Sequence, residues 1–222
     1  MISAIITCAG NGSRFGSDKI LSEISGEPVL VRTIRQFALS KKIDEIIVAA
    51  RTEYICYYQE VLSRFGLKVK FVEGGKERLV SAFNGVKSAN GDFIVIHDGV
   101  RPLTPVWLID NVVEEARKHQ AAMAAVMSTT CIKYVEGSFI KKCLARKKTW
   151  LGQTPQAFKK DLILSCYKKA LENNDFSAKD DCELVSRFGI KVKIVPGDYG
   201  NIKITFPSDI GIAEKIIESS NG

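Results

Sequence analysis

A glycine-rich turn near the start of the chain carries residue types that bind phosphate. Residues 2–21, ISAIITCAGNGSRFGSDKIL, begin as an apolar strand, turn at Gly10 and Gly12, and then supply two cations, Arg14 and Lys19. Glycines let backbone N–H groups approach phosphate oxygens and adopt positive φ at little cost. Arginine and lysine add the positive charge that a polyphosphate requires. The turn therefore predicts a cradle for a nucleoside triphosphate.

The glycine spacing differs from that of two common phosphate-binding loops. A dinucleotide-binding turn would place a third glycine where Phe15 stands, and a Walker A loop would end in G-K-[ST], which does not occur here. An ordinary tight turn is equally compatible with these glycines. The loop alone leaves both interpretations open.

Two later loops place glycines and charged residues directly after an apolar strand. Residues 68–72 lead into GGKER at 74–78, and residues 93–97 lead into DGVRP at 98–102. In open α/β sheets, ligands bind outside the carboxyl ends of the strands. Because the turn at Gly10 also follows a strand, we expect the three loops to share one edge of a sheet.

The elements that must position these loops alternate between apolar strands and amphipathic helices. Short apolar runs at 45–50, 68–72 and 93–97 predict strands, and the segments at about 28–38, 52–65 and 79–87 predict helices. This alternation predicts a three-layer α/β sandwich with a mainly parallel, Rossmann-like sheet.

The second half of the chain is less regular. Residues 121–127 fit an inner strand or the tail of a helix, whereas 190–195 and 201–205 predict strands. Between 130 and 150, two alternating pieces flank EGS, which predicts a protruding two-stranded β-hairpin arm. An isolated hairpin is barely stable in water, so we expect the arm to pack against a second copy of the chain. Asp180 and Asp181 fit a helix cap and a site role equally well.

Length and composition are those of a globular protein. The 222 residues are 45% hydrophobic and 26% charged, which predicts one domain over 1–222 with a dimerisation arm at about 130–150. No apolar run is long enough to cross a bilayer, and the start of the chain has no signal-type segment, so a cytoplasmic location is expected.

Charge and cysteine usage exclude two further classes. The formal charge of +7 is spread along the chain rather than gathered in a stripe with aromatic residues, which argues against nucleic-acid binding. The six cysteines form no C-x-x-C pair and have no neighbouring histidines, so they predict reduced, mostly buried thiols rather than a zinc site.

Six motifs together resemble those of the 2-C-methyl-D-erythritol 4-phosphate cytidylyltransferase family and its near relatives, the ribitol 5-phosphate cytidylyltransferases. Any one motif is weak, but here all six occur in the family's order and spacing over nearly the whole chain. They are AGNGSRFG followed by Lys19, GGKER with Ser81, HDGVRPL, QTPQAF, the aspartate pair at 180 and 181, and NIKITFPSD.

The resemblance implies an activity and a set of site residues. The activity is transfer of a cytidylyl group from CTP to a polyol phosphate with release of pyrophosphate, in a homodimer whose arm reaches the other subunit's site. Arg14 and Lys19 match the cations that stabilise the transition state, and Mg²⁺ is carried mainly by the CTP phosphates, with Asp98 as its protein ligand. The residues that match the CTP contacts are Ala9, Gly10, Gly12, Gly74, Gly75, Ser81 and Asp98, and those that match the acceptor contacts are Arg101, Arg146, Thr154 and Lys203.

Residue chemistry agrees with this implied reaction. An acceptor phosphate is ionised at neutral pH, so its attack on the α-phosphorus needs positioning and positive charge more than a general base. With only His97 and His119 in the chain, a Ser-His or Cys-His pair is not easily assembled. We expect His97 to be a structural residue at the end of its strand.

Three features depart from the family pattern. The loop between Arg14 and Lys19 is two residues shorter than usual, Cys131 replaces a threonine that touches the acceptor phosphate, and Lys179 replaces a threonine before the aspartate pair. They leave two alternatives to transfer onto 2-C-methyl-D-erythritol 4-phosphate. One is ribitol 5-phosphate or another polyol phosphate as the acceptor, and the other is a non-catalytic nucleotide-binding protein.

Overall fold

A seven-stranded sheet forms the centre of the molecule. The computed structural model describes residues 1–10, 15 and 19–220, so the roles predicted for Gly12 and Arg14 lie outside the described residues. The strand order is β11 (Lys193–Pro196), β7 (Ala121–Met127), β10 (Trp150–Lys159), β6 (Phe93–Asp98), β1 (Ile2–Thr7), β4 (Glu45–Ala50) and β5 (Lys70–Glu73). Strand β10 runs antiparallel to both of its neighbours, and the other adjacent pairs are parallel. The prediction of a mainly parallel sheet is confirmed.

The elements alternate along the chain as the sequence pattern predicts. The sheet strands are β1 Ile2–Thr7, β4 Glu45–Ala50, β5 Lys70–Glu73, β6 Phe93–Asp98, β7 Ala121–Met127, β10 Trp150–Lys159 and β11 Lys193–Pro196. Two small hairpins are formed by β2 Glu23–Ile24 with β3 Glu27–Pro28 and by β8 Lys133–Glu136 with β9 Phe139–Cys143. The helices are α1 Val29–Leu39, α2 Thr52–Arg64, α3 Arg78–Ser88, α4 Val106–His119, α5 Lys160–Glu172, α6 Asp181–Arg187 and α7 Ser208–Ser220, with a 3₁₀ turn at Arg146–Lys148.

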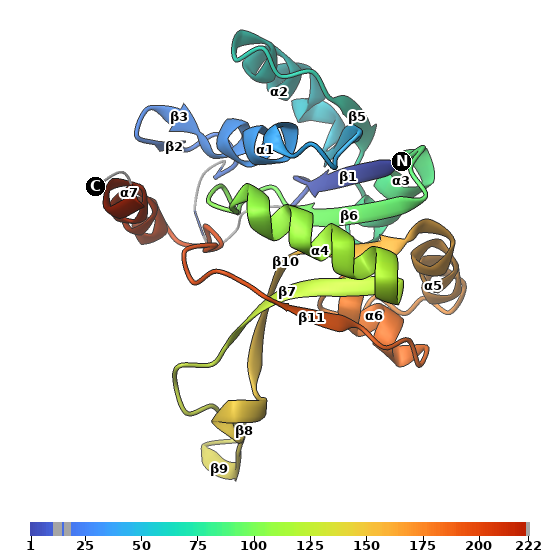
Figure 1. The fold of residues 1–222 in the computed structure, drawn as a ribbon, viewed down its shortest axis with the longest axis vertical. Helices are drawn as coiled ribbons and strands as arrows, with labels where there is room; N and C mark the ends of the chain where they lie inside the picture. Colours follow the sequence, from blue (N-terminus) through green and yellow to red (C-terminus); the bar gives the residue numbers. More distant parts are fainter. Residues whose placement is uncertain (11–14, 16–18, 221–222) are drawn as a thin grey trace.

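Helices cover both faces of the sheet and give the molecule three layers (Figure 1). On one face, α1 and α4 bury residues such as Phe37 and Leu108 against the sheet. On the opposite face, α3 and α5 bury residues such as Val86 and Ile163. Successive strand residues point to opposite faces, so Ile6 belongs to the first core and Ile5 to the second. The predicted three-layer sandwich follows from strands that are apolar on both sides.

The carboxyl ends of three strands meet at one edge of the sheet. Thr7, the last residue of β1, is in register with Ala49 of β4 on one side and with Asp98 of β6 on the other. The loop after β5 joins them, because the Gly74 N–H donates to the carbonyl of Ala50 at 2.7 Å. The expected gathering of the glycine turns and the Asp98 loop is confirmed for the residues that the structure describes.

Two uncertain segments of the second half are now assigned. Residues 121–127 form an inner strand, since β7 lies between β10 and β11. The strand predicted at 201–205 is wrong, because that segment has no ladder and is held by single bonds such as Ile204 N–H to the Val100 carbonyl at 2.9 Å. Its apolar residues alternate because Ile204 is buried beneath the Asp98 loop, without a neighbouring strand.

The hairpin of β8 and β9 extends from the body at the bottom of Figure 1. Its strands pair antiparallel, and the residues of both are exposed, with Phe139 77% accessible. The flanking strands β7 and β10 pair as far as Met127 with Trp150, directly before the hairpin leaves the sheet. Among residues 1–10, 15 and 19–220, no helix has the length and apolar character needed to span a bilayer.

Close packing of α3 on β1 gives a stability prediction. A Cβ added at Gly85 of α3 would lie 2.3 Å from Cγ2 of Ile5, whereas one added at Gly211 of α7 would meet nothing within 4 Å. We expect Gly85→Ala to reduce the free energy of unfolding by about 1–3 kcal/mol through overpacking. Gly211→Ala, the matched control, should be neutral or raise it by about 0.5–1 kcal/mol through helix propensity. Urea unfolding of both variants checks this, and an undiminished stability of Gly85→Ala would contradict the packing described here.

Candidate active site

Two glycine turns form the wall of a pocket at the carboxyl edge of the sheet. The pocket is lined by Ala9, Gly10 and Lys19 from the loop after β1 and by Gly75 and other residues before α3. Gly74 lies just outside it, packed so closely that an added Cβ would be 2.4 Å from Cβ of Ala9. The close approach of the two turns therefore requires glycine at position 74.

Ser81, on the first turn of α3, fixes the second glycine turn. Its hydroxyl accepts a hydrogen bond from the Gly75 N–H at 3.0 Å and lies 3.2 Å from the Glu77 carbonyl, to which it can donate. The Ser81 side chain is buried. The predicted nucleotide-contacting residues Ala9, Gly10, Gly75 and Ser81 are thus brought together.

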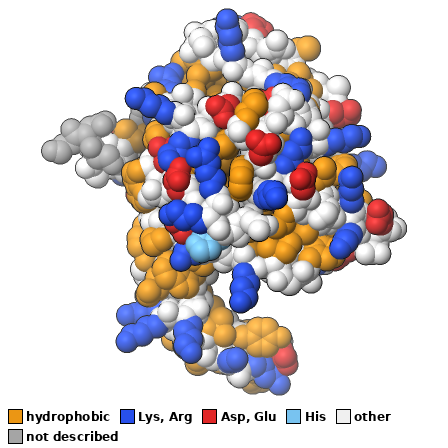
Figure 2. Space-filling view, turned by 45° about the vertical axis from the view of Figure 1, so that its right-hand side comes forward, with side chains coloured by type: hydrophobic (Ala, Val, Ile, Leu, Met, Phe, Trp, Pro, Cys, Tyr) orange, Lys and Arg blue, Asp and Glu red, His pale blue; other side chains and the backbone are white. Residues whose placement is uncertain are grey.

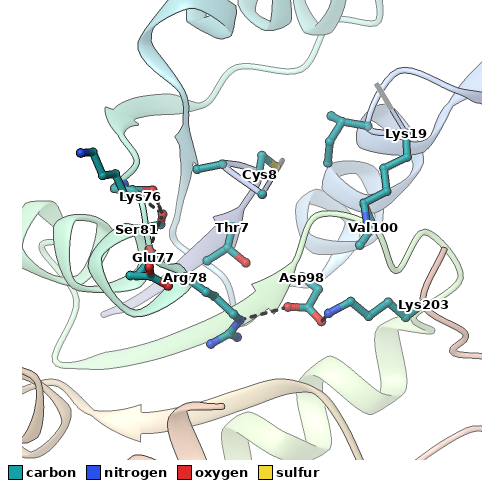
Figure 3. Close-up of a pocket in the computed structure, with 14 residues that line it drawn as sticks. Thr7, Cys8, Lys19, Lys76, Glu77, Arg78, Ser81, Asp98, Val100 and Lys203 are labelled. Atoms are coloured by element: carbon teal, nitrogen blue, oxygen red, sulfur yellow. Dashed lines mark hydrogen bonds and ion pairs between the residues drawn. The ribbon is translucent and has the colours of Figure 1, made fainter. Parts of the chain in front are cut away.

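An aspartate at the end of β6 sits among three cations. The Asp98 carboxylate pairs with Nζ of Lys203 at 2.9 Å, Nε of Arg78 at 3.4 Å and Nε of Arg101 at 3.6 Å. Burial by itself would raise the pKa of Asp98, but Arg78, Lys203 and Arg101 outweigh it and hold that pKa well below its usual value. The carboxylate is therefore ionised at any physiological pH. Figure 3 shows Arg78 and Lys203 approaching it from opposite sides.

A buried chain of hydrogen bonds anchors Arg78. Its Nη1 donates to Asp181 at 2.8 Å, and the other oxygen of that carboxylate accepts from the hydroxyl of Tyr167 at 2.6 Å. Burial works to lower the pKa of Arg78, but Asp181 and Asp98 outweigh it and raise the pKa above its usual value. Of the predicted aspartate pair, Asp180 caps α6 by accepting from the Glu183 N–H at 2.7 Å, and Asp181 braces the site.

His97 holds the backbone around Asp98. Its Nε2 lies 3.2 Å from the Arg101 carbonyl, so we assign the proton to that nitrogen, and its Nδ1 then accepts from the hydroxyl of Thr154 at 2.9 Å. The same hydroxyl accepts from the Asp98 N–H at 3.1 Å. Complete burial lowers the pKa of His97 to about 3, so the ring is neutral. The prediction that His97 is structural is confirmed.

A second pocket lies against the first and shares three residues with it. Its lining includes Arg101 and Thr154, two of the predicted acceptor contacts, and Arg78, Asp98 and Lys203 line both pockets. Each pocket has four basic and two acidic residues in its described lining. Nη2 of Arg78 and Nε of Arg101 are buried donors without a hydrogen-bond partner in the part of the chain that the structure describes. The paired pockets therefore suit anionic ligands.

One predicted acceptor contact lies elsewhere in this chain. Arg146 is exposed in the 3₁₀ turn of the arm, where Nη1 lies 3.4 Å from the Thr129 carbonyl, and it lines neither pocket. Lys19 lines the first pocket and in Figure 3 its side chain extends toward Val100.

Sequence reasoning assigned no role to Arg78, although GGKER contains it. Arg78 could have been predicted as a site residue, because it is a cation that follows a glycine turn at the end of a strand. Arg14 follows such a turn in the same way. Its partner Asp181 is distant in the chain, and no local pattern connects the two.

Asp98 is also the residue to which a magnesium role was assigned. The described residues contain no group of three or more His, Cys, Asp or Glu side chains that could hold a metal ion. A single ionised carboxylate fits Mg²⁺ when substrate phosphates and water supply the remaining oxygen ligands. The donor set thus fits a metal that arrives with the nucleotide and does not fit a cage made of protein ligands alone.

Comparison with known proteins gives a consistent result. The family model described as IspD, 2-C-methyl-D-erythritol 4-phosphate cytidylyltransferase, matches residues 2–219. The enzyme of that name from Caldanaerobacter subterraneus subsp. tengcongensis is 41% identical over 96% of this chain and 97% of its own. The corresponding Clostridium botulinum protein is 39% identical over 98% and 99%.

Solved structures agree with these relatives. The 4-diphosphocytidyl-2C-methyl-D-erythritol synthase of Anaerococcus prevotii superposes with a TM-score of 0.88 at 33% identity, covering 98% of this chain and 96% of its own. The 2-C-methyl-D-erythritol 4-phosphate cytidylyltransferase of Francisella tularensis gives 0.82 at 26% identity, covering 96% and 98%.

The fold, the basic paired pockets and these relatives define the protein first as a nucleotidyltransferase. More particularly, the chain belongs to the 2-C-methyl-D-erythritol 4-phosphate cytidylyltransferase family. The resemblance inferred from the six motifs is confirmed, and membership of an enzyme family argues against the alternative of a non-catalytic nucleotide-binding protein.

The neutral, buried His97 predicts a pH dependence of stability. In the unfolded chain a histidine takes up its proton near pH 6.5, whereas the folded chain resists protonation down to about pH 3. The contribution of His97 to the free energy of unfolding is therefore fully present above pH 6.5 and is lost progressively as the pH falls toward 3. Between pH 7 and pH 5 this residue should remove about 2 kcal/mol of unfolding free energy.

Urea unfolding at the two pH values measures this loss. His97→Gln should show a smaller drop than the wild type, while His119→Gln, which changes an exposed histidine, should keep the wild-type drop. Equal drops in wild type and His97→Gln would contradict the assignment of a neutral ring.

Proposed function

We propose that the protein transfers the cytidylyl group of CTP to 2-C-methyl-D-erythritol 4-phosphate, with CTP in the first pocket and the acceptor in the second. The observation that carries this assignment is the shared wall of Arg78, Asp98 and Lys203. Because these three residues line both pockets, the reacting groups of two ligands that fill the pockets would meet beside them. The cytoplasmic location expected from the sequence stays a prediction.

The reaction is an in-line displacement at the α-phosphorus. An oxygen of the acceptor phosphate forms a bond to that phosphorus, the bond to the β-phosphate oxygen breaks, and pyrophosphate leaves. Two anions must approach each other, and negative charge grows on the oxygens of the transition state. The basic residues of the pockets lower both barriers, because they are held in place before the substrates arrive.

Individual residues have distinct tasks in this scheme. Gly10 and Gly75 line the first pocket without side chains, so the triphosphate can approach the backbone closely there. Lys19 stabilises the transition state, a role shared with Arg14 by resemblance. Arg101 and Lys203 bind the acceptor phosphate. Lys203 is the most accessible of the three cations around Asp98, with 39% of its side chain exposed, and is best placed to turn toward a substrate.

When bound, Mg²⁺ supplies positive charge to the triphosphate and its leaving group. Asp98 is the residue that would hold it on the protein side. The three cations around Asp98 keep this carboxylate ionised and in one orientation, so it is ready to accept a metal without a change of protonation.

We assign Arg146 to the acceptor site of a second copy of the chain. Arg146 lines neither of the two pockets of its own chain and lies on an exposed arm. The arm also carries exposed apolar residues such as Phe139 and Ile140, which a partner would cover. An isolated hairpin of this kind needs a packing partner. The active unit is then a homodimer in which each arm completes the other site.

Lys179 keeps ribitol 5-phosphate as a second candidate acceptor. This lysine lines the second pocket, at a position where the family pattern has a threonine. Pyrophosphate release with CTP and each acceptor separates the two candidates. Turnover with 2-C-methyl-D-erythritol 4-phosphate supports the first, and turnover with ribitol 5-phosphate alone would replace it.

Lys19→Ala tests the transition-state role. Removing one preorganised cation should lower kcat by about 10²–10³-fold. The unfolding free energy should change by less than about 1 kcal/mol, because the residue lies in a loop. Lys215→Ala, which removes an exposed lysine of α7, is the control and should leave kcat unchanged. Near-normal turnover of Lys19→Ala would remove this residue from the mechanism.

Mixing two impaired variants, at an acceptor concentration below the KM of Arg146→Ala, tests where Arg146 acts. In a dimer formed from Lys19→Ala and Arg146→Ala chains, one site carries both defects and the other carries neither, provided that the arm reaches across. Random pairing should then restore about a quarter of the wild-type rate per chain. If Arg146 serves its own chain, every site is defective and co-expression of the variants restores nothing.

Arg146→Ala by itself should raise the KM for the acceptor more than the KM for CTP, because the residue binds only the acceptor phosphate. Steady-state kinetics with each substrate varied in turn gives both values. An equal rise in both would contradict an acceptor role.

A further inference from the structure

Two exposed cysteines of the arm flank one lysine. Nζ of Lys133 lies 3.1 Å from Sγ of Cys131 and 3.2 Å from Sγ of Cys143. The two sulfur atoms touch the same ammonium group, so they are no farther apart than the sum of these distances. The prediction of mostly buried thiols is wrong, because Cys56, Cys131 and Cys143 are exposed and Cys8, Cys166 and Cys182 are buried.

The pair lies in a strongly basic part of the arm. An adjacent ammonium stabilises a thiolate, which is the form that attacks disulfides and other electrophiles. From 133 to 148 the arm carries Lys133, Lys141, Lys142, Arg146, Lys147 and Lys148 against the single acid Glu136. Figure 2 shows basic side chains gathered at the foot of the molecule, where the arm lies. The hydrogen bonds that the Lys133 ammonium donates to Cys131 and Cys143 hold the pKa of Lys133 above its usual value, so the ammonium stays charged.

The backbone allows the two sulfur atoms to meet. Cys143 is the last residue of β9 and lies opposite Lys133 in the ladder. Cys131 precedes β8 by two residues, and between them the Ile132 carbonyl accepts from the Leu144 N–H at 3.0 Å. Diagonal neighbours across a hairpin lie near the upper limit for a disulfide, so the bond requires a small shift of the segment before β8. Cys131 is exposed, so the cost of such a shift is mainly the strain that it places on the hydrogen bond between Leu144 and Ile132.

We propose that Cys131 and Cys143 are a reversible redox site that forms an intramolecular disulfide, with Lys133 as the group that activates them. The oxidant is a low-molecular-weight disulfide. One protein thiolate attacks it, forms a mixed disulfide and releases one small thiolate. The second protein thiolate then attacks the mixed disulfide, the protein disulfide forms, and the second small thiolate leaves. The two protons lost by the protein thiols end on the two released small thiols, so one disulfide is reduced as one is formed.

The consequence for catalysis rests on the proposed function. The bond would tie the segment at 129–131, on which Arg146 makes its contact with the Thr129 carbonyl, to the last residue of β9. Arg146 would then lose its position for the acceptor phosphate, while the CTP pocket, formed by other elements, is unchanged. Oxidation would therefore weaken the binding of the acceptor and leave the binding of CTP unchanged.

Thiol reactivity tests the site without any use of activity. Pulse labelling of the full-length reduced chain with iodoacetamide at pH 7, followed by peptide mass spectrometry, gives the rate at each cysteine. Cys131 and Cys143 should react about tenfold faster than the exposed Cys56, which serves as the internal reference. Lys133→Met should bring the rates down toward that of Cys56, and Lys133→Arg, which keeps the charge, should preserve them. Equal rates at all three cysteines in the wild type would overturn the activation by Lys133.

Oxidised glutathione tests the bond itself. Trypsin cleaves after Lys118, Lys133, Lys142 and Arg146, so the two cysteines fall in peptides 119–133 and 143–146. Treated protein should yield these peptides joined and lighter by two hydrogens than their sum, and a small thiol should separate them again. Cys56→Ser should give the same product. A link between two copies of 119–133, or only glutathione adducts, would overturn the intramolecular disulfide.

Kinetics of the oxidised protein test the consequence. The KM for the acceptor should rise at least about fivefold with that for CTP unchanged, and reduction by a small thiol should restore it. A joined peptide with an unchanged acceptor KM would overturn the link to catalysis and leave the redox site in place. Absence of turnover in the reduced enzyme would count against the proposed function alone. The joined peptide is detected without any measurement of activity, so it would still test the redox site.

Discussion

The Asp98 carboxylate, held by Arg78, Arg101 and Lys203, is the interaction on which the site depends. Three cations gathered in a partly buried space repel one another, and they stay together because a fixed anion lies between them. The anion in turn stays ionised only because the cations offset the cost of its burial. The cations and the anion thus stabilise one another, and Arg78, Asp98 and Lys203 of this cluster line both pockets.

This cluster is connected to the rest of the fold through buried side chains of several elements. Arg78 connects it through Asp181 to Tyr167, and so to the packing of α5 and α6 on one face of the sheet. His97 and Thr154 connect the Asp98 backbone to strand β10 on its other side. Arg101 donates to the Asn201 carbonyl at 2.7 Å and so draws in the segment before α7. Preorganisation of the cations therefore uses contacts from nearly the whole chain.

Sequence patterns predicted the parts of this structure that depend on local chemistry. Glycine turns after apolar strands located the edge of the sheet where the pockets lie, because strand periodicity and turn residues are local signals. The antiparallel placement of β10 and the pairing of Arg78 with Asp181 depend on chain crossings that no local pattern encodes. The segment at 201–205 was misread because one side of it is buried beneath a loop, and burial alone produces the alternation expected of a strand. A role for Arg146 was predicted only through the family resemblance, because its place in the arm puts it apart from the pockets of its own chain.

The ladder between β7 and β10 is interrupted between Gly152 and Gln156 and is regular on either side. Within the interruption, Gln153 and Thr154 turn toward the second pocket, and beyond it the pairing runs out to Met127 and Trp150, where the arm begins. Strand pairing on both sides of the interruption thus fixes the pocket wall before the hairpin begins. Insertions, deletions or exchange of the hairpin beyond this pairing can therefore occur without altering the register of β10 against β7. The architecture lets the hairpin diverge in evolution, or be rebuilt by grafting, while the shape of the pockets is kept.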